Sequence, residues 1–476
     1  MKTKHTKYVV IGLGPAGMAC TLMANSMGIP VTAIEKRKIG GECLNYGCIP
    51  SKALIKACRV KYLAKHSDVF GFRPSELQAL EIFKRVRDVV HAVNVGKTVK
   101  MFETVDLILG KGEARFINEN TVEVADQKIQ AKKIFLCLGT SPKLPTAVPG
   151  FEKINYLTNE TVFDLDDIPR SIIVLGGGPI GCELGQCFAR LGSKVTIVNS
   201  STRLLPKADI EASQLLEQVF RSEGIDIFNN VQVISFNRGM SGEVIVSLSN
   251  GIEINAEKIL IAIGRKMDYS SMNLENAGIK WSSNGIEVND HLQTTNPCVY
   301  AVGDCNGYKL FTHSAMHQGM IAIINSLIPN WLGVFRKNFK RFVVPWSVFT
   351  EPEVSSVGLT ESELRNLGLK YDSVMLKYAD YGRALADGSE IGFVKVYFKK
   401  GVRPTVLGAT IVGENSAEMI HEWALSIQKK LTLFDIMFLQ HSFPTFSFLN
   451  KRIPEQWMMN LFSKTSVLKK FIQKMI

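Results

Sequence analysis

Short apolar runs on either side of a glycine-rich turn open the chain. Residues 8–11 and 31–34 are apolar, and the second run ends at Glu35. Between them, a helical stretch begins at three glycines with GxGxxG spacing, Gly12, Gly14 and Gly17. A strand, a glycine turn, a helix, a second strand and an acidic residue form the unit that binds a dinucleotide. The pattern therefore predicts a nucleotide-binding unit at the start of the chain.

The same pattern recurs in the middle of the chain. Residues 171–175 and 195–198 form the two apolar runs, and the turn between them keeps its three glycines, Gly176, Gly178 and Gly181. Two such turns indicate either two bound nucleotides or a duplicated unit of which one copy has lost its ligand. Because the second turn keeps all its glycines, the sequence favours two nucleotides.

The residue that follows each second strand bears on which nucleotide binds. Glu35 can hold a ribose hydroxyl pair, while the glycines let the backbone approach a pyrophosphate. In the second unit this position is Asn199, with Arg203 close behind. A carboxylate there would repel the 2′-phosphate of NADPH, so its absence slightly favours NADPH. Arg203 would add attraction unless it is an ordinary surface charge, and the choice between NADH and NADPH stays open.

Composition describes an ordinary globular protein. The chain has 476 residues, of which 46% are hydrophobic and 21% charged, and this length suggests about two to four domains. No apolar run reaches the roughly 20 residues that span a bilayer. The first residues imitate a signal peptide, but the glycine spacing that follows indicates a buried strand. We therefore take the N-terminus as mature and expect a cytoplasmic protein.

Charge and cysteine usage argue against two further classes. The net charge of +12 is concentrated in Arg336–Arg341 and Lys451–Lys474, with no accompanying nucleic-acid-binding motif, so we expect no nucleic-acid partner. The nine cysteines are odd in number and scattered along the chain. This usage does not resemble a secreted disulfide framework.

Cys43 and Cys48 lie directly after the first nucleotide-binding unit. A structural zinc site needs about four ligands, and no nearby Cys or His cluster supplies the other two, so we expect no metal site. A structural disulfide is unfavourable in a reducing compartment. The remaining interpretation is a redox pair whose thiolate is stabilised by a helix N-terminus and a cation, for which Lys52 is a candidate.

The segment GGECLNYGCIPSK, which ends at Lys52, resembles the active-site signature of the flavin-dependent pyridine nucleotide–disulfide oxidoreductases. This family includes dihydrolipoamide dehydrogenase, glutathione reductase and mercuric reductase. Three further segments resemble family motifs: 137–140, with Cys-Leu in place of the usual Ala-Thr, 261–265 and 299–304. The resemblance covers nearly the whole chain.

The resemblance implies FAD in the first turn, NAD(P)H in the second, and a homodimer. It implies that Cys48 is the sulfur next to the flavin and Cys43 the sulfur that meets the substrate. Lys52 would pair with Glu183 near the flavin, and Asp304 would hold the ribityl chain. The remaining cofactor-binding positions that it implies are Gly41, Gly139, Gly264 and Gly303.

The expected fold is α/β, with two Rossmann-like nucleotide-binding domains and a C-terminal α+β dimerisation domain. We expect the NAD(P) domain to be inserted in the FAD domain. The expected parts are residues 1–168 (FAD domain, first part), 169–288 (NAD(P) domain), 289–343 (FAD domain, second part), 344–453 (dimerisation domain) and 454–476 (tail). In the dimerisation domain, the pattern predicts strands over 394–398 and 406–412 and a helix over 417–428.

The sequence departs from the family near its C-terminus. The family donates a histidine, before Pro-Thr, and a glutamate from this region as the acid–base for thiol exchange. In register with Pro444, these positions are Phe443 and Phe448, and neither can move a proton. His441 lies nearby but lacks the positioned glutamate. Mercuric reductase instead uses a cysteine pair near its C-terminus, and here the last cysteine is Cys305.

Two basic, aromatic-rich stretches are extra to the family pattern. At helical spacing, Trp331, Phe335, Phe339 and Phe342 of the insertion at about 329–342 share one side, with basic residues on another. The tail over 454–476 mixes apolar residues with lysines in the same way. Either both stretches pack at the dimer interface, or they lie on a membrane surface at the inner face of the cytoplasmic membrane.

These observations predict electron transfer from NAD(P)H through FAD and the Cys43–Cys48 disulfide to an acceptor that needs no His–Glu relay. A membrane quinone, or another small-molecule electron acceptor, fits best. The alternatives are a disulfide reductase of the dihydrolipoamide dehydrogenase type in which His441 replaces the base, and a catalytically weak redox-sensing flavoprotein. Intact Cys43, Cys48, Lys52 and Glu183 argue against the last.

Overall fold

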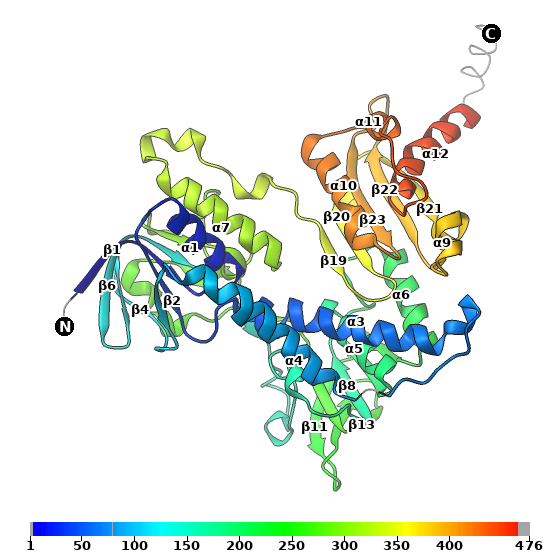
Figure 1. Ribbon diagram of the computed structural model, residues 1–476, viewed down its shortest axis with the longest axis horizontal. Helices are drawn as coiled ribbons and strands as arrows, with labels where there is room; N and C mark the ends of the chain where they lie inside the picture. Colours follow the sequence, from blue (N-terminus) through cyan, green and yellow to red (C-terminus); the bar gives the residue numbers. More distant parts are fainter. Residues whose placement is uncertain (1–2, 79, 465–476) are drawn as a thin grey trace. The chain divides into compact units, whose positions relative to one another are not determined.

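The computed structural model describes residues 3–78 and 80–464 (Figure 1). Its described residues form two compact units, and each is treated by itself below. The first unit lies within Met1–Ala57, Gln78–Gly176 and Val233–Arg341. The second lies within Cys58–Leu77, Gly177–Gln232 and Phe342–Ile476.

A mostly parallel sheet forms the centre of the first unit. Its strands run in the order β3-β2-β1-β6-β5-β4, and β18 also pairs with β6. β1, β2, β3, β6 and β18 are mutually parallel neighbours, which requires crossover connections such as α1. The bounds are β1 Thr3–Ile11, β2 Val31–Glu35, β3 Asp106–Leu109, β4 Arg115–Asn118, β5 Thr121–Val124, β6 Gln127–Leu136 and β18 Val299–Ala301.

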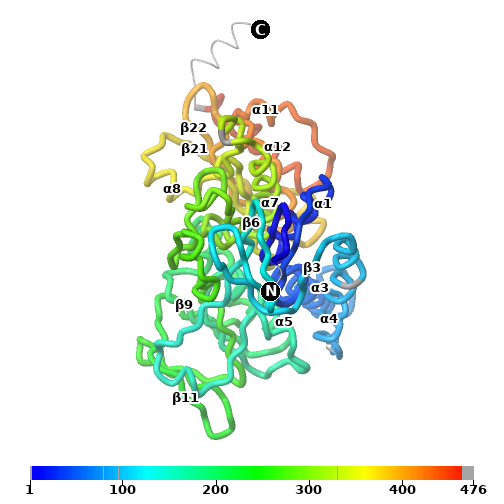
Figure 2. The backbone as a smooth tube through the Cα atoms, turned by 90° about the vertical axis from the view of Figure 1, so that its left-hand side faces the viewer, coloured from blue at the N-terminus to red at the C-terminus, as the bar shows by residue number. Residues whose placement is uncertain are grey.

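Two helices pack against each other beside this sheet, α1 (Pro15–Ser26) and α7 (Thr312–Leu327) (Figures 1 and 2). They approach closely because Gly319 of α7 has no side chain: a Cβ there would lie 2.7 Å from the carbonyl oxygen of Ala16. The short α2 (Gly41–Tyr46) and the longer α3 (Cys48–Lys65) follow β2, and α4 (Ile82–Val93) comes later.

Smaller sheets complete the first unit. β8 pairs with β14 in parallel, β7 with β15 and β16 with β17 in antiparallel, and β11, β12 and β13 form an antiparallel sheet. The bounds are β7 Ser141–Pro142, β8 Ser171–Leu175, β11 Val233–Arg238, β12 Val244–Leu248, β13 Glu253–Ala256, β14 Lys258–Ile261, β15 Arg265–Lys266, β16 Trp281–Ser282 and β17 Gly285–Ile286.

The second unit combines an α/β element with an antiparallel sheet. The former consists of α5 (Pro179–Leu191), α6 (Ile210–Ser222) and the parallel pair β9 (Lys194–Asn199) and β10 (Asp226–Asn229). The sheet order is β19-β20-β23-β22-β21. Its strands are β19 Trp346–Val348, β20 Val354–Gly358, β21 Tyr371–Lys377, β22 Phe393–Lys399 and β23 Val406–Val412.

Helices cover this antiparallel sheet. α10 (Ser416–Lys429) packs on β20 and β23, and α12 (Phe448–Lys464) packs on β21 and β22 (Figure 1). The fully buried Trp423 of α10 donates from Nε1 to Oδ1 of Asn450 in α12 at 2.8 Å, which links the two helices. The short helices are α8 Glu361–Asn366, α9 Gly382–Ala386 and α11 Leu433–Met437.

The expected α/β class is confirmed, and the apolar runs that define it form strands. Residues 171–175 form β8 as expected, and the two strands and the helix expected after residue 393 are β22, β23 and α10. β1 starts earlier than its apolar run because its polar first residues pair with β6. The five-part domain division stays a prediction, although α12 runs through the boundary expected at 453/454.

The amphipathic helix expected over about 329–342 does not form. The segment instead has two short 3₁₀ turns, Asn330–Phe335 and Phe339–Arg341, separated by extended Arg336. The side chain of Asn325 exchanges hydrogen bonds with the backbone of Lys337 at 2.8 and 2.9 Å, so these backbone groups cannot join a helix. Gly333 further weakens helix formation.

The aromatic residues of this segment consequently separate. Trp331 and Phe335 are 81% and 66% exposed, whereas Phe339 is 3% exposed and packs against Tyr308. The guanidinium of Arg336 is also occupied, since it donates to Gln293 and to the carbonyl of Ile328. A single apolar face carrying Trp331, Phe335 and Phe339 was therefore a wrong expectation.

The beginning of the expected tail belongs to the second unit's core. Trp457 of α12 packs edge-on against Phe398 and Phe434, with ring centroids 6.2 and 5.0 Å away. Residues 465–476, which hold most of the expected tail lysines, lie outside the described residues. Among the residues that are described, no helix is long and apolar enough to cross a membrane.

Candidate functional site

The first glycine turn combines close packing with open space. A Cβ at Gly12, whose φ is +92°, would lie 2.4 Å from the carbonyl oxygen of Cys137, and one at Gly17 would lie 1.8 Å from that of Gly12. A Cβ at Gly14, by contrast, would meet no atom within 4 Å, and α1 begins directly after it with Pro15. The turn thus leaves backbone N–H groups and free space at a helix N-terminus, which suits a pyrophosphate.

Glu35 holds the shape of this turn. Its Oε2 accepts from the backbone N–H of Leu13 and its Oε1 from that of Arg37, both at 2.7 Å. Each carboxylate oxygen can accept a second hydrogen bond, so these contacts leave room for a ribose hydroxyl. A Cβ at Gly41 would lie 2.7 Å from the Cα of Gly14. The ribose-binding role of Glu35 stays a prediction.

Asp304 is a buried carboxylate with an unsatisfied oxygen. Among the described residues, its Oδ1 has no hydrogen-bond partner. Burial raises the pKa of Asp304 to about 6, against the lowering effect of Arg265. The preceding Gly303, whose φ is +81°, lies tightly between Ala315 and Ala16, which fixes the position of the carboxylate. A buried acceptor of this kind requires a donor, such as a ligand hydroxyl.

These residues fit the FAD that the resemblance implies. Gly14 leaves space for a pyrophosphate at the helix N-terminus, and the unpartnered oxygen of Asp304 would accept from a hydroxyl of the ribityl chain, a role that stays a prediction. Gly139 and Gly264 have positive φ, and a Cβ at either residue would meet no atom within 4 Å, so each also borders open space. The carbonyl of Gly139 is fixed by the hydroxyl of Tyr269 at 2.7 Å.

The two cysteines lie at the junction of two helices. Cys43 is within α2, and Cys48 is the first residue of α3, with Gly47 between the helices. All nine cysteines are among the described residues and all are thiols. A hydrogen bond between the two thiols, together with burial, raises the pKa of Cys43. Sγ of Cys48 lies 3.3 Å from Oγ1 of Thr312, the first residue of α7.

Lys52 and Glu183 belong to different units, so their expected ion pair stays a prediction. Nζ of Lys52 donates to Oγ of Ser51 at 3.3 Å. Glu183 is buried in α5, where its Oε1 accepts from the backbone N–H of Phe349 at 2.9 Å. The carboxylate is therefore placed by the second unit itself.

The second glycine turn repeats the first in its essentials. A Cβ at Gly176, whose φ is +113°, would lie 2.3 Å from the carbonyl oxygen of Ala262. Gly178 is the N-cap of α5, and a Cβ there would meet no atom within 4 Å, whereas Gly181 is buried in the helix. Free space again lies at a helix N-terminus, as nucleotide binding requires.

The side-chain amide of Asn199 is hydrogen-bonded to neighbouring residues. Its buried amide donates to the carbonyls of Ser201 and Arg203 at 3.1 and 2.9 Å, and to Oδ1 of Asn229 at 2.9 Å. Arg203 donates to the carbonyl of Pro206 at 3.0 Å, while its buried Nε has no partner among the described residues. Asn199 thus shapes the loop, and a phosphate contact of Arg203 stays a prediction.

The C-terminal aromatic pair and His441 lie in the second unit. Phe443 is 73% exposed and packs edge-on against Phe448, with ring centroids 5.3 Å apart. The expectation that His441 lacks a positioned glutamate is wrong, because its Nε2 lies 3.0 Å from Oε1 of Glu422. Nδ1 lies 3.4 Å from the carbonyl of Leu439, so both ring nitrogens have partners.

Sequence reasoning missed Glu42 and Thr312 and treated Arg265 only as part of a motif. The guanidinium of Arg265 contacts the carboxylate of Glu42, directly before Cys43. These two residues are 223 positions apart, which no local pattern can connect. The signal that could have been noticed is a carboxylate inside the cysteine signature.

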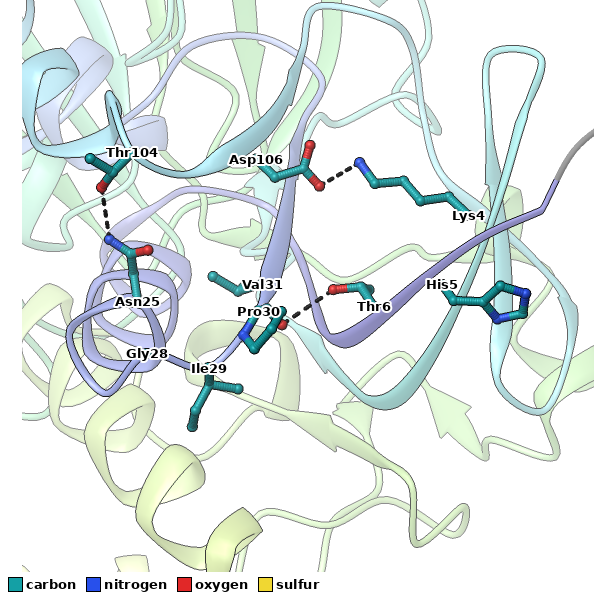
Figure 3. A pocket seen from close by; sticks show the side chains of 10 residues that line it. All are labelled: Lys4, His5, Thr6, Asn25, Gly28, Ile29, Pro30, Val31, Thr104 and Asp106. Atoms are coloured by element: carbon teal, nitrogen blue, oxygen red, sulfur yellow. Dashed lines mark hydrogen bonds and ion pairs between the residues drawn. The ribbon is translucent and has the colours of Figure 1, made fainter.

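A separate surface cleft of about 370 Å³ lies at the amino ends of β1, β2 and β3 (Figure 3). In it Lys4 pairs with Asp106, and Asn25 donates to Thr104 at 3.0 Å (Figure 3). The glycine turn lies at the other, carboxyl end of β1, where α/β sheets bind ligands. The cleft is therefore not part of the candidate site. Within residues 3–78 and 80–464, no group of His, Cys, Asp and Glu is arranged to hold a metal ion.

Two family models and several relatives match this chain. The family model of the pyridine nucleotide-disulphide oxidoreductases matches residues 6–319, and that of their dimerisation domain matches residues 344–452. Mercuric reductase from Bacillus cereus is 33% identical over 90% of this chain and 68% of its own length. Dihydrolipoyl dehydrogenase from Thermus scotoductus is 32% identical over 93% of this chain and 95% of its own.

Solved structures share the same architecture. The HOCl-induced flavoprotein disulfide reductase RclA from Escherichia coli superposes with a TM-score of 0.84 at 26% identity, covering 94% of this chain and 99% of its own. LpdA from Mycobacterium tuberculosis gives the same score and identity, covering 95% of this chain and 99% of its own.

Replacing Asp304 by asparagine should weaken FAD binding and remove its pH dependence. A hydrogen bond to a charged acceptor contributes about 1.5–3 kcal/mol, so the dissociation constant should rise roughly tenfold or more. Wild-type affinity should fall as the pH drops through about 6, because protonation removes the charge that accepts the hydroxyl. FAD fluorescence on release, measured from pH 5 to pH 8, checks this. Asp88→Asn, an exposed acid on α4, is the control, and an unchanged pH profile in Asp304→Asn would contradict the assignment.

Asn199→Asp should destabilise the second unit rather than simply change nucleotide preference. The substitution replaces a buried donor by a carboxylate oxygen that faces two carbonyls and Asn229. Leaving such groups unsatisfied costs about 1–3 kcal/mol. Thermal unfolding of the full chain measures the effect, with Asn250→Asp in an exposed turn as the matched control. Equal melting temperatures for the two variants would show that these hydrogen bonds contribute little.

Proposed function

Since the chain belongs to the class I pyridine nucleotide–disulphide oxidoreductases, which use FAD and NAD(P)H, we propose that Cys43 and Cys48 relay electrons from NAD(P)H to an acceptor that needs no C-terminal acid–base. The enzyme is an NAD(P)H-dependent flavoprotein oxidoreductase, and its dimerisation domain makes it a homodimer. The paired thiols beside the N-terminus of α7 are the observation that carries the proposal.

The cysteines and the cofactor-binding residues have separate roles in the proposed relay. Bound FAD supplies the transfer of an electron pair between the nicotinamide and the disulfide. Cys48, next to Thr312, is the sulfur on the flavin side, and Cys43 is the sulfur that meets the acceptor. Reduction opens the Cys43–Cys48 bond and leaves two thiols, and oxidation by the acceptor closes it again. Asp304 and the first glycine turn orient the cofactor.

The C-terminal segment lacks the acid–base pair that a disulfide acceptor would need, and this bears on the class of electron acceptor. Phe443 and Phe448 carry no titratable group where thiol exchange would need one. His441 is held by Glu422 and by the carbonyl of Leu439, so it would have to break these contacts to serve as a base. General acid–base catalysis contributes about 10²–10⁴ in rate, so efficient turnover of a disulfide substrate is disfavoured.

We propose that the acceptor is a membrane quinone and that the protein lies at the inner face of the cytoplasmic membrane. Supporting this, Trp331, Val334 and Phe335 are 81, 87 and 66% exposed on one short 3₁₀ turn. Exposed basic residues follow within the same segment, Lys337, Lys340 and Arg341. Apolar residues beside cations suit the surface of an anionic bilayer.

A soft metal ion is a second candidate acceptor. Three of the relatives are named mercuric reductases, and a Cu(II) complex of RclA is known, 27% identical to this chain over 96% of its length. Thiolates favour soft metals, and the Cys43–Cys48 pair provides two. A disulfide reductase using His441 and a weak redox sensor remain the alternatives from other classes.

An acceptor screen tests the relay. Wild-type enzyme should oxidise NAD(P)H with a soluble quinone, whereas lipoamide and glutathione disulfide should turn over slowly. Cys43→Ser and Cys48→Ser should each reduce quinone turnover at least tenfold while FAD stays bound, and Cys298→Ser serves as the control. Full quinone activity in Cys43→Ser would show that electrons bypass the dithiol. Faster turnover with Hg(II) or Cu(II) than with any quinone would establish the metal acceptor instead.

The same screen with His441→Ala decides the disulfide alternative. Because both nitrogens of His441 are engaged, its loss should change disulfide turnover little. Rapid wild-type turnover of lipoamide that collapses in His441→Ala would identify a disulfide reductase. Phe443→His combined with Phe448→Glu should raise that turnover if the missing acid–base alone limits it.

Vesicle binding tests the membrane surface. Full-length protein should co-sediment with anionic phospholipid vesicles at low salt, with partial release at high salt. Replacing Trp331, Val334 and Phe335 together by serine should weaken binding at least tenfold, since each buried side chain contributes about 1.5–3 kcal/mol. Phe72→Ser, which alters another exposed aromatic residue, is the control. Equal binding of the triple variant and wild type would rule out this surface.

A further inference from the structure

The helix that carries Cys43 is too short to be stable by itself. α2 has six residues, whereas isolated helices need about 12–15 to form in water. One side of it is held through Asn45, whose amide donates to the carbonyls of Ile39 and Gly41 at 3.1 and 2.7 Å. Asn94 in turn donates to Oδ1 of Asn45 at 2.6 Å.

Glu42 holds the other side. Its Oε2 pairs with Nη2 of Arg265, and its Oε1 accepts from Nδ2 of Asn159 at 2.6 Å. Asn159 also donates to the carbonyl of Tyr46, the last residue of α2, at 3.4 Å. Both ends of the helix are therefore attached to the same polar cluster.

Arg265 is fixed independently of Glu42. Its Nε donates to Oγ1 of Thr140 at 2.9 Å, its Nη2 donates to the carbonyl of Thr140 at 2.8 Å, and its Nη1 donates to Oδ1 of Asn159 at 3.3 Å. The side chain is 14% exposed. The cation is therefore preorganised, and Glu42 attaches Cys43's helix to it.

The charges in this cluster act on one another. Burial raises the pKa of Glu42, partly against the attraction of Arg265. Asp304 is stabilised as an anion by Arg265, while the charges of Glu42 and Cys48 oppose its ionisation. Arg265, Glu42 and Cys48 thus all lie close enough to Asp304 to act on its carboxylate, and Arg265 and Glu42 do so with opposite sign.

We propose that Glu42 and Arg265 are positioning residues of the dithiol: their ion pair holds α2 so that Cys43 meets Cys48, and their opposite charges balance at the Cys48 sulfur. The inference rests on the relay role of the two cysteines. It assigns a task to a carboxylate that directly precedes Cys43 and to an arginine at the end of a different motif. The two halves of the task are separable by experiment.

The electrostatic half of the proposal predicts that Glu42→Gln and Arg265→Gln shift the pH at which Cys48 reacts in opposite directions. In Glu42→Gln, the charge of Arg265 is no longer offset, so the thiolate of Cys48 becomes more stable and reacts at lower pH. In Arg265→Gln, the negative charge of Glu42 is left unbalanced, so the thiol becomes reactive only at higher pH. Each shift should be about 0.5–1 pH unit. The double variant should lie near wild type, because both charges are gone.

The measurement uses the reduced holoenzyme. Iodoacetamide alkylation rates are followed against pH and assigned to Cys43 and Cys48 by mass spectrometry, while FAD content and melting temperature report on folding. Glu123→Gln and Arg115→Gln, which break a partly exposed ion pair between β4 and β5, are matched controls. Shifts of the same sign in Glu42→Gln and Arg265→Gln, or shifts no larger than in the controls, would overturn the proposal.

The positioning half of the proposal is tested by the rate at which the Cys43–Cys48 disulfide re-forms. Glu42→Gln retains a group that can contact Asn159, whereas Glu42→Ala removes it. When the reduced enzyme is oxidised with diamide, which takes up the two electrons and two protons, the alanine variant should therefore re-form the Cys43–Cys48 disulfide several-fold more slowly. Equal rates in the two variants would overturn this half. Neither measurement requires turnover of any acceptor. A failed acceptor screen with the expected alkylation shifts would therefore refute the proposed function and leave the role of Glu42 and Arg265 intact.

Discussion

The close contact between the first glycine turn and the end of β6 determines the geometry of the dithiol site. The backbone of Gly12 lies against the carbonyl of Cys137, and this contact admits no side chain. It fixes the start of α1, whose Ala16 in turn abuts Gly303 and Gly319. Through these contacts α7 is held against α1, and its first residue, Thr312, reaches Cys48. The first glycine turn, the carboxylate of Asp304 and the Cys43–Cys48 pair are therefore all positioned by the same close backbone contacts.

Local spacing predicted the parts of the site that are local. The glycine turns, Glu35 and the cysteine pair are each defined within a few residues, and the strands around them formed as expected. The contacts that the sequence did not predict are long-range: Glu42 with Arg265, and His441 with Glu422. Hydrophobic periodicity also failed over 329–342, because Asn325 binds the backbone of Lys337 and thereby prevents the helix that the apolar spacing predicts.

Hydrogen-bond partners distinguish side chains that can bind a ligand from those that only stabilise the structure. Asp304 keeps a buried oxygen without a partner among the described residues, which is the property of a ligand-binding group. Asn199 and His441, both plausible functional residues by position, have their polar atoms satisfied by neighbours. Sequence position alone gives all three residues equal weight, and only their hydrogen bonds separate them.

The location of Phe443 and Phe448 has an evolutionary consequence. The glycine turn, Asp304 and both cysteines lie in the first unit, whereas this aromatic pair lies in the second, where Phe448 stacks on Tyr381. Substitutions at these two positions therefore change no residue of the unit that holds Asp304 and the dithiol. If this pair sets the acceptor as proposed, a lineage can change its terminal electron acceptor through residues 443 and 448 alone, while the unit that holds the first glycine turn stays under unbroken selection.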